Sequence, residues 1–467
     1  MKEFFENQGA QQQAFVLLPK SELDAIASSL AELKELAENA VRDPGNAIAL
    51  SEDGQPEYLE GMDLEISSYG KGDIRRPALE ITHYDGDFTS DFRYVSHSCD
   101  KGRGPSQQLP ASHDHGEPCE HLRLEMRDGS YGLTLLMDYW VYSDSDVISR
   151  RSILRNDSDK DATINSLASL QLDLPGHDYQ ITTFNGSWAN EMNRHDTVLS
   201  AGSYVNSSYS GTSSSRSNPF TMISRQADED KGEVYGLNLI YSGNHMTSFE
   251  VGIAGHTRVL SGINPANFAW LLQPGRGFES PEAIMSYSRQ GFNGLSRHMH
   301  DFINRHIIPE HWQNKTRPVL LNSWEACYFD INAEKLLALA DKGARCGMEL
   351  FVLDDGWFAE RNDDTSSLGD WWTNKEKLPE GLGFLADKIR DMGLQFGLWV
   401  EPEGINVNSY LYAIRPEWVL ENPAHPHSEG RHERLLNLGD PKVAEYLVGF
   451  VSQLIEANHL SYVKWDM

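Results

Sequence analysis

The sequence has few cysteines, and this scarcity excludes two classes of protein. Only four cysteines occur among 467 residues, and they follow neither a CxxC nor a mixed Cys/His spacing. So few thiols in so long a chain do not make a disulfide scaffold, and their spacing gives no zinc site. We expect four free thiols, at Cys99, Cys119, Cys327 and Cys346.

Long apolar runs are also missing. No stretch approaches the ~18 apolar residues that a membrane-spanning helix needs. The first residues, MKEFFENQGAQQQ, lack the basic and then apolar pattern of a signal peptide. These features predict a cytoplasmic protein with no membrane partner.

Positive charge is the third scarcity. The chain has 40 Lys and Arg against 69 Asp and Glu, a formal net charge of -29. Phosphate groups would be repelled by such a surface, so we expect no nucleic acid and no anionic lipid as partners.

The chain is too long for one compact core, and its patterns predict three parts. Residues 1–50 form an atypical helical segment, in which Ser21–Val41 has apolar residues at helical spacing. Residues 51–308 alternate in short segments separated by turn residues, which predicts a large antiparallel β domain. Leu122–Met126 and Leu133–Tyr142, for example, flank an Asp-Gly turn, and Glu233–Tyr241 and Phe249–Ile253 flank Ser-Gly-Asn. A helical pattern then closes this part.

Residues 309–467 alternate between strand and helix, which predicts a parallel sheet. The expected strands are Val319–Leu321, Leu350–Leu353, Phe396–Val400 and Tyr462–Asp466, and the expected helices are Ala333–Cys346, Leu382–Met392 and Val443–Ala457. Four such units are the first half of a (β/α)8 barrel. An open parallel edge is unusual, so we expect the barrel to be incomplete and truncated after Met467.

Polar and aromatic residues follow each of these four strands. In a barrel the strand ends converge on one face, where active sites lie. The residues concerned are Asn322 to Glu325, Asp354 to Trp357, Trp399 to Glu403, and Lys464 to Asp466. Paired carboxylates beside an aromatic ring suit the hydroxyl groups and the apolar face of a sugar.

Lys464 and Asp466 are two residues apart on a strand, so both side chains point to the same face. The ammonium favours the ionised form of Asp466 and so makes it a competent nucleophile. A buried structural ion pair is the alternative. Trp324 and Trp399 can equally be core residues, and Arg431 can be a surface arginine.

Six motifs, LNSWEACYFD, LFVLDDGWF, SLGDWW, FGLWVEPE, SEGR and YVKWDM, resemble glycoside hydrolase family 36, the retaining α-galactosidases. Upstream segments such as SYGKGDIRRPALEI resemble that family's N-terminal β-supersandwich. The resemblance implies hydrolysis of terminal α-linked galactose, as in melibiose and raffinose, by double displacement. It implies neither a metal nor an organic cofactor.

The resemblance also implies roles for particular residues. Asp466 would be the nucleophile, and the substrate-binding residues would be Asp354, Asp355, Arg431, Lys464, Trp324, Trp399 and, from the β domain, Trp188. Family members typically form homotetramers. Residues 1–50 depart from the family pattern, which leaves the tetramer of this chain in doubt, and the family's acid/base Asp is expected beyond Met467.

Three alternatives stay open at this point. The chain can be a galactose-binding module without catalysis, or an α-N-acetylgalactosaminidase. It can also be a metal-assisted barrel with Asp354, Glu401 and Asp466 as oxygen ligands, although Lys464 would repel the cation.

The missing acid/base leads to a first prediction. Loss of general acid catalysis costs about 10²- to 10⁴-fold in rate. Purified residues 1–467 should therefore show little or no turnover of raffinose-type galactosides in a galactose-release assay. Turnover equal to that of a complete family member would contradict the prediction.

Overall fold

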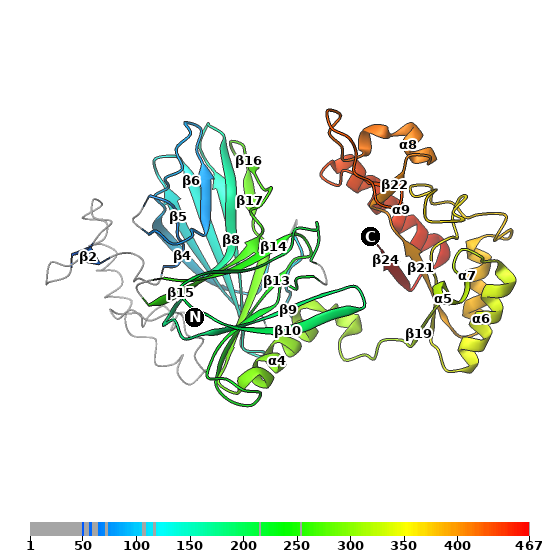
Figure 1. The fold of residues 1–467 in the computed structure, drawn as a ribbon, viewed down its shortest axis with the longest axis horizontal. Helices are drawn as coiled ribbons and strands as arrows, with labels where there is room; N and C mark the ends of the chain where they lie inside the picture. Colours follow the sequence, from blue (N-terminus) through cyan, green and yellow to red (C-terminus); the bar gives the residue numbers. More distant parts are fainter. Residues whose placement is uncertain are drawn as a thin grey trace. The chain divides into compact units, whose positions relative to one another are not determined.

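The chain folds as two compact units, Met1–Asn314 and Lys315–Met467 (Figure 1). The sequence places the boundary between residues 308 and 309, a few residues earlier. The computed structural model describes residues 49–50, 56–57, 64–70, 73–104, 109–114, 118–213, 216–252 and 255–466. The expected helix Ser21–Val41 lies outside these residues.

The first unit contains a ten-stranded sheet in the order β10-β9-β12-β13-β18-β7-β6-β5-β4, with β17 also paired to β7. All of its pairs are antiparallel. Its strands are β4 (Arg93–Lys101), β5 (Glu120–Asp128), β6 (Leu133–Tyr142), β7 (Val147–Asn156), β9 (Gln180–Ser187), β10 (Asn190–Val198), β12 (Thr221–Arg225), β13 (Glu233–Ile240), β17 (Gly277–Glu279) and β18 (Glu282–Ser288).

A six-stranded antiparallel sheet in the order β11-β14-β15-β8-β16, with β3 paired to β8, forms the second layer. Its strands are β3 (Leu79–Thr82), β8 (Ala162–Pro175), β11 (Gly202–Ser207), β14 (His245–Val251), β15 (His256–Ile263) and β16 (Trp270–Leu272). A short pair, β1 (Ala49–Leu50) and β2 (Pro56–Glu57), precedes them.

The two sheets share a core, which makes this unit a large β sandwich. One buried cluster joins Leu172 of β8 and Phe249 of β14 with Ile223 of β12 and Leu237 of β13. Such a core between two inner faces is the basis of sandwich packing. The helix α4 (Gly291–Phe302), the π-helical turn Ile303–Ile307 and the turn Glu310–Trp312 end the unit. The predicted antiparallel β domain is confirmed.

The two examples chosen from the sequence differ in outcome. β5 and β6 form the expected antiparallel hairpin. β13 and β14 are both strands, but β13 pairs within the ten-stranded sheet and β14 within the six-stranded one. The Ser-Gly-Asn segment therefore carries the chain from one layer of the sandwich to the other.

The second unit is built on four parallel strands in the order β19-β20-β21-β24. They are β19 (Leu320–Asn322), β20 (Leu350–Leu353), β21 (Gln395–Val400) and β24 (Tyr462–Trp465). The helices are α5 (Trp324–Cys327), α6 (Ala333–Arg345), α7 (Leu382–Asp391), α8 (Tyr410–Ile414) and α9 (Pro441–Asn458). A short pair, β22 (Gly404–Asn406) and β23 (Glu433–Leu435), and the turn Pro416–Trp418 complete the unit. The predicted four βα units of a barrel are confirmed.

Local sequence explains where its helices begin and which face they bury. The Asn332 side chain accepts a hydrogen bond from the Lys335 amide and caps α6, whose Leu336 and Ala340 are buried on one face. Asp440 caps α9 in the same way, with Pro441 in its first turn. β20 is buried on both faces, as expected of an inner parallel strand.

Two expectations from composition can be compared with the structure. All four cysteines are free thiols, as predicted. In the part of the chain that the structure describes, no helix combines the length and the apolar character needed to cross a membrane.

Four buried charges tie segment 73–75 to the six-stranded sheet. Arg258 of β15 donates from Nε to Asp173 of β8 at 2.8 Å, and its Nη1 lies 2.8 Å from Asp73. Arg75 pairs with Asp73 at 2.9 Å and lies 3.4 Å from Asp173. All four side chains are at most 2% exposed. Each charge therefore depends on the others for the interactions that water would otherwise provide.

We predict that Arg258→Met lowers the free energy of unfolding of the first unit by about 3–5 kcal/mol, because buried Asp173 loses both hydrogen bonds from this guanidinium and Asp73 loses one of its two arginine partners. Urea unfolding followed by circular dichroism measures the change. The matched control is Glu120→Gln, which breaks the exposed Lys101–Glu120 pair and should cost less than about 1 kcal/mol. Equal effects of the two substitutions would contradict the prediction.

Candidate functional site

Lys464 lies between two carboxylates at the tips of β20 and β24, the strands on either side of β21. Its Nζ donates to Asp354 Oδ2 at 2.8 Å and lies 3.7 Å from Asp466 Oδ2. Asp354 follows β20, whereas Lys464 and Asp466 are on and directly after β24. The Asp466 side chain is 47% exposed and that of Asp354 is 3% exposed. The lysine thus connects a buried carboxylate with one that solvent can reach.

Asp354 is held by groups from three strands. Its Oδ2 also accepts a hydrogen bond from Asn322 Nδ2 of β19 at 2.6 Å, and its own amide donates to Ser323 Oγ. Its Oδ1 accepts from the Asp355 amide at 2.9 Å. Lys464 of β24 supplies the remaining contact, so the side chain has one defined orientation.

Asp355 lies beside Asp354 and pairs with the fully buried Arg361. The guanidinium donates from Nε to Oδ1 at 3.1 Å and from Nη2 to Oδ2 at 2.9 Å. Burial raises the pKa of Asp355, and the hydrogen bonds and charge of Arg361 act in the opposite direction. Gly356 has φ +98, a conformation that few other residues adopt, and it turns the chain away after the two aspartates.

Trp399 reaches the same place from β21. It pairs in register with Lys464, and its Nε1 donates to Asp466 Oδ2 at 3.0 Å. The residue is only 3% exposed and its ring stacks on Phe358 at 6.0 Å. Trp399 therefore contacts Asp466 through its N–H, and its ring belongs to the core rather than to an open rim.

Arg431 and Trp324 lie at the tips of other elements. Arg431 Nη2 is 3.2 Å from both Glu401 and Glu433, and its side chain is 52% exposed. Trp324 is half-buried and is the first residue of α5, which follows β19. Its amide donates to Oδ1 of Asn322, the residue whose Nδ2 donates to Asp354. Its ring packs edge-on against Phe329.

Trp188 differs from the other predicted residues. It lies in the first unit, at the turn between β9 and β10, and is 90% exposed. The structure thus brings together Asp354, Lys464, Asp466 and Trp399 by direct contacts, with Asp355 adjacent in the chain. Trp188 belongs to the other unit.

Sequence reasoning missed two charged residues. Arg361 lies in the loop after β20 and Glu433 begins the short strand β23, so neither follows the strand-end pattern of the four parallel strands. The only available signal was indirect: a segment as apolar as Trp357-Phe358-Ala359 leads the chain into the interior, where a following arginine needs an acidic partner.

The metal-site alternative finds little support. Among the described residues, no three His, Cys, Asp or Glu side chains are grouped so that they could hold a metal ion. The Lys464 ammonium occupies the space between Asp354 and Asp466, where a cation would have to bind.

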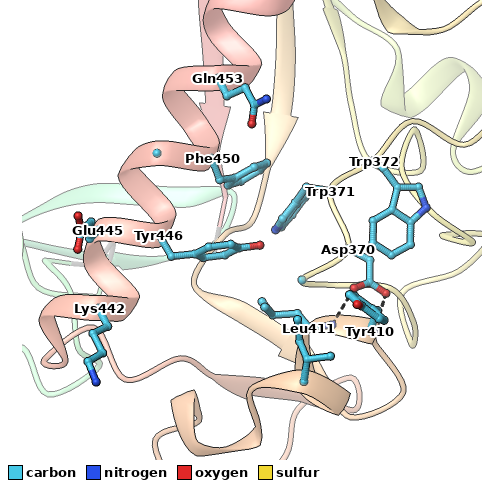
Figure 2. A pocket seen from close by; sticks show the side chains of 13 residues that line it. Asp370, Trp371, Trp372, Tyr410, Leu411, Lys442, Glu445, Tyr446, Phe450 and Gln453 are labelled. Atoms are coloured by element: carbon cyan, nitrogen blue, oxygen red, sulfur yellow. Dashed lines mark hydrogen bonds between the residues drawn. The ribbon is translucent and has the colours of Figure 1, made fainter.

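A separate cavity of about 670 Å³ lies in the same unit (Figure 2). Figure 2 shows the rings of Trp371, Tyr446 and Phe450 on one side and Tyr410 on the other, with Asp370 capping α8. None of the predicted site residues lines it. The cavity is therefore distinct from the strand-tip cluster.

Comparison with known families identifies the class of protein. Residues 26–273 match the glycosyl hydrolase family 36 N-terminal domain, and residues 277–467 match Melibiase. The chain belongs to glycosyl hydrolase family 36.

Individual relatives are α-galactosidases. The chain is 40% identical over 411 residues to α-galactosidase AgaA of Geobacillus stearothermophilus, covering 88% of this chain and 56% of that protein. It is 37% identical over 410 residues to Mel36A of Lactobacillus acidophilus, covering 87% and 56%.

Solved structures agree with these matches. The crystal structure of AgaA superposes with a TM-score of 0.85, covering 88% of this chain and 57% of that one. An α-galactosidase from Lactobacillus brevis gives 0.87 at 38% identity, covering 90% and 57%. Variants of AgaA have been solved with raffinose and with stachyose. The chain spans a little over half the length of these relatives.

The site generates a prediction about Glu401. Burial, together with Glu433 and Asp466, raises the pKa of Glu401 to about 7. A carboxyl group whose pKa is raised on folding destabilises the fold as pH rises from its unfolded pKa, near 4.5, to about 7. Glu401→Gln should therefore stabilise the second unit by roughly 1–3 kcal/mol at pH 8.

The effect should vanish below about pH 4.5, where the carboxyl is protonated in both states. Urea unfolding at pH 4, 6 and 8 tests this, with the exposed Glu360→Gln as the control substitution. A stabilisation that is the same at all three pH values would argue against a titrating Glu401.

Proposed function

We propose that this chain carries the galactose-binding and nucleophilic half of a retaining α-galactosidase, which acts on terminal α-linked galactose in oligosaccharides such as melibiose and raffinose. The observation that supports it most is the cluster of Asp354, Lys464, Asp466 and Trp399 at the tips of three parallel strands. Its geometry gives one exposed carboxylate and a set of oriented hydrogen-bonding groups, as a sugar-cleaving site needs.

The chemistry follows from these positions. The Asp466 carboxylate would attack the anomeric carbon and form a covalent galactosyl ester, while the aglycone leaves with its glycosidic oxygen. Lys464 and Trp399 each direct a proton donor toward Asp466, which fixes its orientation and stabilises its charge before attack. Water then hydrolyses the ester with retention of configuration.

Galactose itself would be held by the surrounding polar groups. Asp354, Asp355, Lys464 and Arg431 would bind the hydroxyl groups, and Trp324 would offer a partly exposed ring for the sugar face. The second carboxyl group of the mechanism, roughly 5 Å from the nucleophile, is assigned to none of the described residues. The site needs neither a metal ion nor an organic cofactor for these steps.

The proposal extends to the assembly of the whole protein. The relatives' family typically forms homotetramers, and the 90% exposed Trp188 of the first unit would contribute to a site in such an assembly. We propose a homotetramer for a protein that contains the whole barrel.

Covalent labelling tests the proposal. A fluorinated galactosyl fluoride should label Asp466 of the purified chain, because fluoride leaves with little protonation and the first step then depends on the nucleophile alone. Mass spectrometry after peptic digestion locates the label. Asp466→Asn should abolish it, since an amide is a poor nucleophile.

The matched control is Asp363→Asn, at an exposed loop carboxylate of the same unit, which should leave labelling unchanged. A glucosyl fluoride of the same design should react much more slowly. Galactose binding without any label on Asp466 would instead support a binding module.

A further inference from the structure

A row of alternating charges connects Asp355 with Arg431, two of the residues proposed to bind galactose. Asp355 pairs with Arg361 at 2.9 Å, and Arg361 Nη2 lies 3.9 Å from Glu433 Oε1. Arg431 Nη2 lies 3.2 Å from Glu433 Oε2 and 3.2 Å from Glu401. Asp355 and Arg431 have proposed roles in binding galactose, but Arg361 and Glu433 have none so far.

Arg361 is fixed on every side. Its side chain is 0% exposed, its Nη1 donates to the Ser366 carbonyl at 2.8 Å, and its guanidinium lies 5.8 Å from the centre of the Phe358 ring. Lys377 donates to the Arg361 carbonyl at 2.7 Å and so holds the backbone as well. A planar fork held this firmly determines the plane of the carboxylate that it binds.

Glu433 joins this buried pair to the exposed Arg431. It lies on β23, which is paired with β22, so its backbone is held by a ladder. Its side chain is 12% exposed, and Oε1, which faces Arg361, has no hydrogen-bond partner. Arg431, by contrast, has φ 51 and a half-exposed side chain. Glu433 is thus a fixed acceptor between a rigid arginine and a freer one.

We propose that Arg361 and Glu433 are positioning residues of the galactose site: Arg361 orients Asp355 as an acceptor of sugar hydroxyl groups, and Glu433 couples this pair to Arg431. This inference rests on the proposed function, because Arg361 and Glu433 would hold in place two residues that bind the sugar.

Electrostatics gives the inference a measurable signature. The charged groups that face Asp355 are Arg361, Lys377, Asp354 and Glu433. Without the Arg361 charge, the pKa of Asp355, already raised by burial, would rise further, and only Lys377 would oppose the two acidic neighbours. If galactose binding needs an ionised Asp355, the affinity of such a variant would then fall at a higher pH than that of the unsubstituted chain.

The experiment measures the affinity of purified residues 1–467 for galactose, a ligand without charge, by ligand-observed NMR between pH 5 and pH 8. We expect Arg361→Gln to weaken binding most at pH 5 and distinctly less at pH 8, because the acidic limb of the binding profile should move to higher pH by about one unit. The control Arg345→Gln removes an exposed arginine paired with Asp341 on α6 and should change nothing.

A second arm tests Glu433 and does not depend on Arg361→Gln folding. Glu433→Gln and Arg431→Gln should each weaken binding severalfold, and the double substitution should be no worse than Arg431→Gln alone, because Glu433 acts through Arg431. Additive effects would overturn this coupling, as a pH-independent loss in Arg361→Gln would overturn the role of Arg361.

The outcomes also separate the inference from the function on which it rests. If the unsubstituted chain does not bind galactose, the proposed function is wrong and the inference falls with it. If it binds galactose and the variants behave like the control, the inference alone is wrong.

Discussion

The strand-tip cluster depends on one ammonium group. Lys464 neutralises part of the repulsion between Asp354 and Asp466, which belong to loops more than a hundred residues apart in the sequence. Only the parallel register, in which Lys464 of β24 lies beside Trp399 of β21, brings them within reach. The strand pairing of the sheet therefore determines which charged side chains meet. Without the lysine, the two carboxylates would repel each other at this end of the sheet.

Much of this arrangement was predictable because regular structure has regular spacing. The four strands and three helices predicted for the second unit agree with the observed ranges to within one or two residues, since apolar runs and capping residues are local signals. The short elements α5, α8, β22 and β23 were not predicted. The two-residue separation of Lys464 and Asp466 predicted a common face, and their contact agrees with it. The convergence of parallel strand ends predicted that Asp354 and Trp399 lie near this pair.

What could not be predicted depends on irregular segments. The pairing of Arg361 with Asp355 follows from the path of the loop after Gly356, which no periodicity specifies. Trp399 is buried because Phe358 and Trp371, from that same loop, cover its ring. In the first unit, strand character of β13 and β14 was visible, but the change of layer between them was not. Pairing partners are non-local choices, and one sequence gives no direct signal of them.

The indole of Trp399 has a further consequence. Its N–H is bonded to Asp466, and its peptide carbonyl accepts a hydrogen bond from the indole of Trp357 at 2.9 Å. Two indole rings are thus linked by successive hydrogen bonds to the carboxylate at which an ester would form. Esterification would remove the anion next to one indole and so change its excited-state environment. The protein therefore contains its own optical reporter, and its intrinsic emission would follow the occupancy of Asp466 without any added dye.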